Sequence, residues 1–376
     1  MKVLQFVTDG SHGGGTNHML QLLRGFKQTH NMLLLTQQDS YLVREAEKLG
    51  IQVVTGDFFR SRFSLSAIRK VKETIRQFQP DVIHCVGGRA AFFRSCVLSS
   101  VPSAYSVQGF HLIQKKPFAK IASLFGEFWS FRRINHIIFP SDSDRRIALG
   151  FKLLPRKKRY SVILNRVPKP QIEECKPEEK LGVGFVGRMT YQKNPQLFVE
   201  MLTRLPDVQA TIVGGGELES EVKQLVDSRG LSNRVTFYGG LDHDATLKAI
   251  SRFDVLVMTP RWECVSLLML EAMFLRVPVV STPAGGIPEA ITHRQTGMLS
   301  KGEDADELAG FVKELLENDE LREQIIENAA TRAANEFEEG IMLRQIRETY
   351  QSLAETRKQP ILQRVASRLW NRANST

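Results

Sequence analysis

The strongest constraint on the fold is a regular alternation of short apolar runs with helix-length segments. In the first half, the runs that predict strands are Val3–Thr8, Asn31–Thr36, Gln52–Thr55, Val82–His84, Ser103–Val107, His136–Pro140 and Ser161–Leu164. In the second half they are Gly182–Val186, Ala210–Val213, Val235–Tyr238, Val255–Met258, Val277–Ser281 and Met298–Leu299. Segments such as Met19–Gln28 and Leu65–Phe78 lie between them and have the length of helices. This pattern predicts an α/β protein with doubly wound parallel sheets.

The length and one break in the pattern predict two domains. A chain of 376 residues is long enough for two domains of ordinary size. Residues 167–180 are rich in proline and charge and have no apolar periodicity, which is typical of a linker. We therefore predict α/β domains at residues 1–166 and 181–340, followed by a helical tail at 341–376.

The composition is that of a globular protein, with 42% hydrophobic and 24% charged residues. No stretch approaches the ~18 apolar residues of a membrane span. The first residues read as a buried strand and lack a signal-peptide core, so a cytoplasmic location is expected. Four cysteines without metal-site spacing (Cys85, Cys96, Cys175 and Cys264) are interpreted as reduced thiols.

The net charge of +10 is unevenly distributed along the chain. Residues 1–165 hold 25 Lys and Arg against 10 Asp and Glu, a balance of +15, whereas the remainder has 26 against 31, a balance of −5. This asymmetry favours an acidic partner for the first half. No pattern typical of nucleic-acid readers is present, so an anionic membrane surface or a phosphate-bearing acceptor is expected instead.

Glycine clusters follow two of the predicted strands. Gly13-Gly14-Gly15 precedes a helix expected from Asn17, and Gly214-Gly215-Gly216 follows Val213. Glycine allows close backbone approach to a ligand, and the start of a helix favours anions. We therefore expect Gly14, Gly15, Gly215 and Gly216 to bind the ligand, with ordinary turns as the alternative. The sequence from Gly182 to Gly187 matches G-x-G-x-x-G, but its glycines lie within a strand and do not predict a dinucleotide site.

Charged residues gather after two strands of the second half. Arg188 and Lys193 follow the strand ending at Val186, and paired cations suit a diphosphate. Glu263 follows the strand Val255–Met258, and Glu271 lies one to two turns into the next helix. Open α/β sheets bind ligands at the carboxyl ends of their strands. A site for a phosphorylated, hydroxyl-bearing ligand is therefore predicted, with a solvated basic loop and two surface glutamates as the alternative.

Taken in order, these motifs resemble the retaining glycosyltransferase family 4, which has the GT-B fold. The resemblance runs through most of the chain and is strongest over residues 181–290. It rests on the Gly-Arg and Lys-Asn segment (Gly187, Arg188, Lys193, Asn194), the glycine loop Val213–Glu217, the strand end Phe237 and Gly239, the pair Glu263 and Glu271, and the loop Gly285–Glu289.

The resemblance implies two facing Rossmann-like domains with the active site in the cleft between them, and a final helix crossing back to the N-terminal domain. It implies that Arg188 and Lys193 bind the donor diphosphate and that Glu271 holds the ribose hydroxyls. Glu263 is implied to act in catalysis beside the donor sugar. Backbone N–H groups of three following residues are implied to reach the sugar and phosphate: Val265, Ser266 and Leu267. No metal and no cofactor are expected.

The chain departs from the family pattern at three places. Gln108 stands where the family often has a His. Either His111 partly substitutes for it in catalysis, as we expect, or a contact with the donor sugar is missing. The family usually has Gly-Phe-Gly-Leu-Pro after the first glutamate, where this chain has Cys-Val-Ser-Leu-Leu at residues 264–268. Asn165-Arg166 replaces the usual Asn-Gly.

The function implied by the resemblance is sugar transfer from a nucleotide-diphosphate sugar, a UDP-sugar in preference to GDP-mannose. The expected acceptor is a cell-surface glycan, as in lipopolysaccharide, or a lipid-linked one. A nucleotide-sugar 2-epimerase of the same fold and a catalytically impaired member acting as a binding protein remain alternatives. The mixture of aromatic and basic residues over Lys115–Arg133 predicts either an interfacial helix at the inner face of the cytoplasmic membrane or a helix packed on the sheet.

Overall fold

A computed structural model describes residues 1–11, 13–58, 64–110, 117–171 and 180–358. The chain divides into two compact units. Unit 1 comprises Met1–Ile163 together with Met342–Thr376, and unit 2 comprises Leu164–Ile341. Val167, which falls in the expected linker, is fully buried in unit 2, where its N–H donates to the Phe337 carbonyl at 3.1 Å. Residues 172–179 of that linker and residues 359–376 of the tail lie outside the described residues.

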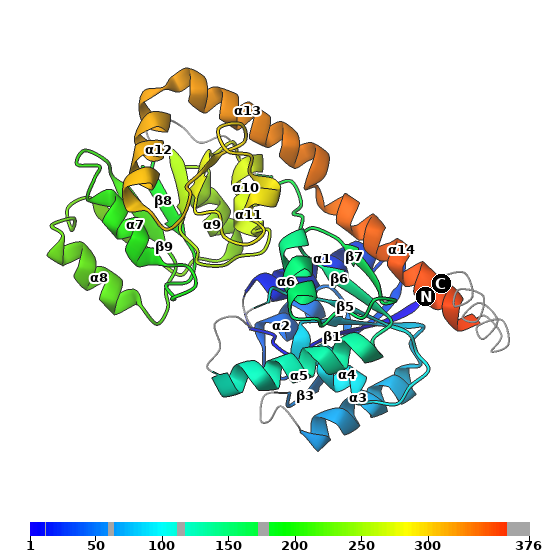
Figure 1. Cartoon of the computed structure of the whole chain (residues 1–376). Coiled ribbons are helices and arrows are strands. Elements are labelled where there is room, and N and C mark those ends of the chain that lie inside the picture. The colour runs from blue at the N-terminus through cyan, green and yellow to red at the C-terminus, as the bar shows by residue number, and fades with distance from the viewer. Residues whose placement is uncertain (12, 59–63, 111–116, 172–179, 359–376) are drawn as a thin grey trace. The chain divides into compact units, whose positions relative to one another are not determined.

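Unit 1 is built on a seven-stranded sheet in the order β3-β2-β1-β4-β5-β6-β7, with every neighbouring pair parallel. Its strands are β1 (Lys2–Val7), β2 (Asn31–Gln37), β3 (Gln52–Gly56), β4 (Val82–Val86), β5 (Ser103–Ser106), β6 (His136–Phe139) and β7 (Arg159–Val162). Its helices, labelled in Figure 1, are α1 (Gly14–Phe26), α2 (Tyr41–Lys48), α3 (Leu65–Phe78), α4 (Gly88–Ser95), α5 (Pro117–Arg133), α6 (Asp142–Gly150) and α14 (Glu339–Lys358). The central strands are buried almost throughout, as expected where helices cover both faces of a parallel sheet.

Helix α14 joins unit 1 from Met342 onward, although it begins three residues earlier. Four of its apolar residues are buried in the same core cluster as Phe26 and the β1 residue Val3: Met342, Ile346, Tyr350 and Leu353. Their spacing of three or four residues places them on one face of the helix. The orange-red α14 in Figure 1 is therefore held to the unit by an apolar stripe.

A polar cluster lies inside unit 1 beneath α14. The imidazole of His84 on β4 lies 2.6 Å from the Tyr350 hydroxyl through Nδ1 and 2.7 Å from the Ser106 hydroxyl through Nε2. Gln5 of β1 donates from Nε2 to the Tyr350 oxygen at 2.9 Å. All four side chains are buried, and burial lowers the pKa of His84 to about 3, so the ring is neutral.

Unit 2 repeats the architecture with six parallel strands in the order β10-β9-β8-β11-β12-β13. The strands are β8 (Val183–Val186), β9 (Ala210–Val213), β10 (Val235–Gly239), β11 (Val255–Met258), β12 (Val279–Ser281) and β13 (Met298–Leu299). The helices are α7 (Pro195–Leu202), α8 (Glu219–Ser228), α9 (His243–Ile250), α10 (Leu267–Phe274), α11 (Ile287–Ala290), α12 (Ala305–Glu317) and α13 (Asp319–Glu336). Apolar clusters fill both faces of this sheet.

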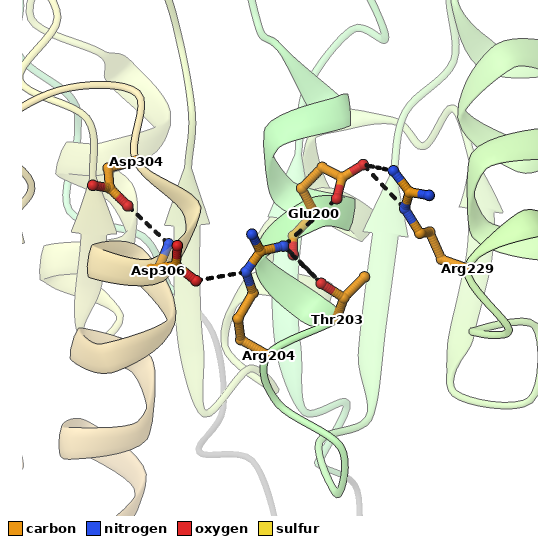
Figure 2. Close-up of polar contacts among 6 residues, drawn as sticks. All are labelled: Glu200, Thr203, Arg204, Arg229, Asp304 and Asp306. Carbon is orange, nitrogen blue, oxygen red and sulfur yellow. Dashed lines mark hydrogen bonds and ion pairs between the residues drawn. The ribbon is translucent and has the colours of Figure 1, made fainter.

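A chain of polar contacts ties three helices together on the surface of unit 2 (Figure 2). Arg229, which follows α8, donates from Nη2 to the Glu200 carboxylate on α7 at 2.6 Å. Arg204, just after α7, donates from Nε to Asp306 of α12 at 2.7 Å. Asp304 caps the start of α12 by accepting from the Asp306 N–H at 2.9 Å.

The predicted fold class is confirmed, because both halves are doubly wound parallel sheets. Every predicted strand is present, with ends shifted by at most two residues. The start of α1 was predicted wrongly, since the helix begins at Gly14 and takes in Gly14 and Gly15 as its first turn. The Asn17 N–H donates to the Gly13 carbonyl at 2.9 Å, so a main-chain bond extends the helix through residues of low helix propensity.

Candidate functional site

The clearest candidate site lies where the strand order of unit 2 reverses. Strands β8 and β11 are neighbours, although β9 and β10 separate them in sequence. The connections that leave their carboxyl ends run in opposite directions from this point, which opens a crevice for ligands in sheets of this type. The loops after β8 and β11 carry Arg188, Lys193 and Glu263, so the topology brings the predicted charged residues to one edge.

Lys193 and Glu263 meet between these two loops. The Lys193 Nζ donates to the Glu263 carboxylate in a close ion pair, and the two side chains are 20% and 12% exposed. Thr259 at the end of β11 donates from its hydroxyl to the carbonyl oxygens of Lys193, at 3.0 Å, and Asn194, at 2.8 Å. Asn194 itself has a left-handed backbone, with φ of 50°, immediately before α7. The Thr259 contacts therefore join the backbone at Lys193 to the segment that leads to Glu263, which holds the Lys193–Glu263 pair in place.

The pairing of Lys193 with Glu263 was not anticipated from the sequence, where the two were assigned to different parts of the ligand. A half-buried ammonium beside a carboxylate can exchange that partner for a phosphate oxygen of similar charge. Arg188 lies in the same loop and is exposed. Within the described part of the chain, its guanidinium makes no hydrogen bond or ion pair. The loop thus offers two cations to an anionic ligand.

Glu271 is a buried carboxyl in α10, only 8% exposed as a residue. Its Oε1 lies 3.6 Å from Nε2 of His243, the first residue of α9. Burial raises the pKa of Glu271 to about 8, so the isolated protein holds this carboxyl largely protonated at neutral pH. A buried carboxyl of this kind is costly for the fold and is more typical of a ligand site than of a packing position.

The loop between β11 and α10 is fixed by residues outside it. Asn165, which is buried, donates from Nδ2 to the Val265 carbonyl at 3.0 Å. Ser266 is the N-cap residue of α10, and Leu267 is its first helical residue. The first N–H groups of a helix have no partner within it and are available to a ligand. The geometry is therefore compatible with the backbone role expected for residues 265–267.

The Gly285-Gly286 loop holds the other end of the same segment. The Gly286 N–H donates to the Glu263 carbonyl at 3.0 Å. Gly285 has φ of +56°, and a Cβ there would lie 1.9 Å from that carbonyl oxygen. This glycine is required by the close approach of two backbones. The contact therefore fixes the backbone position of Glu263.

The glycine loop after β9 packs against the loop after β8. The Met189 N–H donates to the Gly215 carbonyl at 2.9 Å. A Cβ on Gly216, where φ is 154°, would lie 2.6 Å from the Met189 carbonyl oxygen, and a Cβ on Gly214 would lie 2.0 Å from that of Gly187. These glycines therefore have a packing role, which supports the loop that carries Arg188 and Lys193. A ligand contact of Gly215 or Gly216 stays a prediction.

In unit 1, the predicted residues gather at the start of α1. Gly15 faces Gln108, whose Oε1 would lie 3.7 Å from a Cβ on that glycine, and space around Gly14 is open. Asp144 of α6, which is buried, accepts from the Phe110 N–H at 2.9 Å and so anchors the segment after Gln108. His111, the second predicted catalytic residue, lies outside the described residues.

Sequence reasoning assigned no role to several residues that hold the site together. Thr259 and Asp144 fix backbone carbonyl and N–H groups, and Gly285 permits a close backbone contact. Asn165 was named only where Asn165-Arg166 replaces the usual Asn-Gly of the family pattern, yet its side chain holds the loop before α10. These functions depend on partners 22 to 100 residues away in sequence, so local pattern gives no signal for them.

No group of three or more His, Cys, Asp or Glu side chains among the described residues is arranged to hold a metal ion. None of the described helices combines the length and the apolar character that crossing a membrane requires.

Two family models match the two halves of the chain. Residues 169–332 match the model for glycosyl transferases group 1, and residues 12–168 match the model for Glycosyltransferase Family 4. Among curated proteins, an alpha-D-kanosaminyltransferase of Streptomyces kanamyceticus is 31% identical over 157 residues, which is 41% of each chain. A sulfoquinovosyl transferase of Arabidopsis thaliana is 26% identical over 300 residues, which is 73% of this chain and 57% of the relative. The chain thus spans less than two thirds of the length of these relatives.

Solved structures confirm the fold. HepE of Anabaena, in complex with UDP and with UDP-glucose, is similar with a TM-score of 0.81 and 21% identity, over 94% of this chain and 100% of that one. Sucrose-phosphate synthase of Thermosynechococcus elongatus is similar with a TM-score of 0.81 and 16% identity, over 94% and 99%. The two Rossmann-like units are those of the GT-B fold.

Proposed function

We infer that this chain, which carries both domains of the GT-B glycosyltransferases, is an enzyme that transfers a sugar from a nucleotide-diphosphate sugar to an acceptor hydroxyl. One observation carries the proposal: the Lys193–Glu263 pair at the point where the strand order of unit 2 reverses. The buried Glu271 in the next helix supports it. A cation and two carboxylates at the carboxyl ends of neighbouring strands suit a ligand with a diphosphate and several hydroxyls.

The chemistry assigns a role to each group. During transfer, the bond between the anomeric carbon and the diphosphate oxygen breaks, and the nucleoside diphosphate leaves with added negative charge. Arg188 and Lys193 stabilise that charge because fixed cations cost no reorganisation when it develops. Glu263, released from Lys193 as the phosphates bind, lies next to the donor sugar. Glu271 accepts hydrogen bonds from the ribose hydroxyls.

The finer parts of the proposal concern the donor, the stereochemistry and the metal. We propose a UDP-sugar, because UDP or UDP-glucose is bound in solved structures of two proteins of this fold. We propose transfer with retention at the anomeric carbon and without a metal ion, the cations of the loop after β8 taking the role of one. Turnover that is unchanged in excess EDTA would support metal independence, and loss of turnover restored by a divalent cation would reject it.

We further propose a lipid-linked or phosphate-bearing acceptor at the cytoplasmic face of the membrane. The +15 balance of residues 1–165 supports an anionic partner. Helix α5 exposes Ile121 (66%), Phe125 (53%) and Phe128 (43%), which are spaced to lie on one face. Arg132 lies over the Phe128 ring at 3.2 Å, so a cation accompanies the apolar surface. This combination suits a helix lying at a membrane interface.

A panel of UDP-, GDP- and ADP-sugars, read by nucleotide release and by labelled product, tests the function. Nucleotide release with sugar appearing in a glycan or lipid acceptor is the expected result. Release from none of the donors, or isomerisation of the donor sugar without release, would overturn transferase activity. Isomerisation would identify the 2-epimerase alternative, and nucleotide binding without turnover would identify a binding protein.

Co-sedimentation with vesicles tests the membrane proposal separately. We expect binding to vesicles that contain anionic lipid, weakened by Phe125→Ser and by moderate salt, because charges more than about 8–10 Å apart are largely screened there. Equal binding to neutral vesicles, or no change in the Phe125→Ser protein, would reject α5 as the contact. Leu98→Ser, which alters a leucine that is 84% exposed outside α5, is the control.

A further inference from the structure

His243 stands beside the buried Glu271 at the carboxyl edge of the unit 2 sheet. It is the first residue of α9, the helix that follows β10, and its Nε2 lies 3.6 Å from Glu271 Oε1. The histidine side chain is 42% exposed and the glutamate side chain is 10% exposed. The imidazole therefore lies between the buried carboxyl and solvent, where a ligand approaching Glu271 would meet it.

The position of His243 is fixed by the start of its helix. Asp242 is the N-cap residue of α9, and its carboxylate accepts from the Ala245 N–H at 2.8 Å. The same aspartate carbonyl accepts from the Thr246 N–H at 2.9 Å. A capped first turn holds the histidine backbone in place. Helix α9 also packs against α10, which carries Glu271.

The charged groups on the other elements around α10 have their own partners. Arg276, after the end of α10, pairs with Glu327 of α13 at 2.5 Å. Arg332 of α13 donates to the carbonyl of Glu289 in α11 at 3.0 Å. Strand β12 contributes no ionisable side chain. Among the described residues, the ionisable side chain that lies within ion-pair distance of Glu271 is that of His243.

We propose that His243 is a positioning residue for the donor nucleotide, which receives the Glu271 proton when the nucleotide binds. The proposal rests on the proposed function and adds to it a residue that the sequence did not indicate. Before binding, the carboxyl carries the proton and the imidazole is neutral. On binding, the proton moves from the Glu271 oxygen to Nε2 of His243, and the carboxylate accepts the ribose O–H groups.

This proton transfer offsets the effect of burial on the protonation state of Glu271. Because burial raises its pKa to about 8, the carboxyl is largely protonated at pH 7, and it then accepts hydrogen bonds from two ribose hydroxyls less well than a carboxylate does. Transfer to the neighbouring imidazole keeps the total charge of the pair unchanged, so the buried charge is compensated at once. Without the histidine, the proton must leave to solvent, and binding becomes dependent on pH.

Isothermal titration calorimetry with UDP, in buffers of different ionisation enthalpy, measures the protons released. We expect the unmodified protein to release few protons at pH 7 and to bind UDP with an affinity that changes little from pH 6.5 to 8. We expect His243→Asn to release close to one proton, to bind about tenfold more weakly at pH 7, and to recover affinity as the pH rises toward 8. Asp244→Asn, which alters the adjacent exposed residue, should match the unmodified protein.

The outcomes separate this proposal from the proposed function. If His243→Asn binds UDP with unchanged affinity and an unchanged proton count, the proposal is wrong, while sugar transfer by the same protein would leave the function standing. If Glu271→Gln binds UDP as well as the unmodified protein does, no carboxylate is needed and the proton transfer is rejected. If the unmodified protein binds none of UDP, GDP and ADP, both the proposal and the proposed function fail.

Discussion

The two units share one strand order but place their polar side chains in opposite ways. In unit 1, the adjacent central strands β1 and β4 carry Gln5 and His84, which hydrogen-bond to Tyr350 inside the core. In unit 2, the equivalent strands β8 and β11 have no polar side chain, and the charged residues Lys193 and Glu263 lie in the loops that follow.

The difference shows what topology does and does not determine. A reversal of strand order opens the same edge in both sheets. Among the described residues, an ammonium and a carboxylate meet there in unit 2, where Lys193 pairs with Glu263 and is supported by Thr259 and Gly285. In unit 1, the polar groups inside the sheet hold α14, and the excess positive charge of residues 1–165 accompanies exposed apolar residues on α5. The donor-binding role is therefore proposed for unit 2 alone.

The largest expected effect tests whether the site belongs to unit 2. We expect Lys193→Ala to lower kcat/KM by about 10²–10³-fold, because it removes a fixed cation from the charge that develops on the leaving diphosphate. Lys27→Ala, an exposed lysine of unit 1, should change UDP affinity less than twofold. Sugar-transfer kinetics and UDP calorimetry on both proteins make the comparison. Equal losses in the two variants, or full activity in Lys193→Ala, would remove the distinction between the units.

A second prediction compares one glycine from each unit. We expect Gly285→Ala to destabilise unit 2 by about 2–4 kcal/mol, because its left-handed backbone and the Glu263 carbonyl 1.9 Å from a Cβ both oppose a side chain. Gly14→Ala in unit 1 should not destabilise, since the space around it is open and alanine favours the helix. Denaturant unfolding measures both. Loss of activity in a stable Gly14→Ala protein would support a ligand contact there.

The third prediction is that acidification affects the two units in opposite directions. Burial lowers the pKa of His84 to about 3 and that of His18 to about 4, below their usual 6.5. The unfolded chain then binds more protons below pH 6.5, so each histidine costs unit 1 about 2 kcal/mol of stability between pH 6.5 and 5. Glu271, with its pKa raised to about 8 from 4.5, has the opposite sign and stabilises unit 2 as the pH falls through that range.

Hydrogen exchange followed by mass spectrometry distinguishes the units within the full chain. At pH 5 compared with pH 7, after correction for intrinsic rates, peptides of β1 and β4 should lose protection relative to peptides of β8 and β11. His84→Gln should reduce the pH dependence of unit 1, although it lowers stability at pH 7 by removing buried hydrogen bonds. An equal change in protection across both units would show that the buried histidines do not control the pH dependence of stability.

The sequence predicted the sheets well, because short apolar runs and the helices between them are local signals. It also indicated Lys193, Glu263 and Glu271, because charges at the ends of predicted strands must lie at one edge of a parallel sheet. It did not indicate that Lys193 pairs with Glu263, nor that His243 lies beside Glu271, because these contacts join segments 70 and 28 residues apart. Gly14 and Gly15 were wrongly predicted to precede α1, because a main-chain bond to Gly13 extends the helix through them.

The smallest expected effect concerns the exposed contacts on unit 2 in Figure 2. Arg204 is paired with Asp306 at 2.7 Å and Glu200 is paired with Arg229 at 2.6 Å, yet these side chains remain substantially exposed. Solvent screens such pairs, and fixing long side chains costs entropy, so Arg204→Ala should change stability by less than about 1 kcal/mol and leave UDP affinity unchanged. Denaturant unfolding in low and high salt measures this change in stability. Lys223→Ala, which breaks the exposed ion pair of Lys223 with Glu219, is the matched control. A loss as large as that of Gly285→Ala would show that surface charge, and not the backbone contact at the β11 loop, dominates the stability of unit 2.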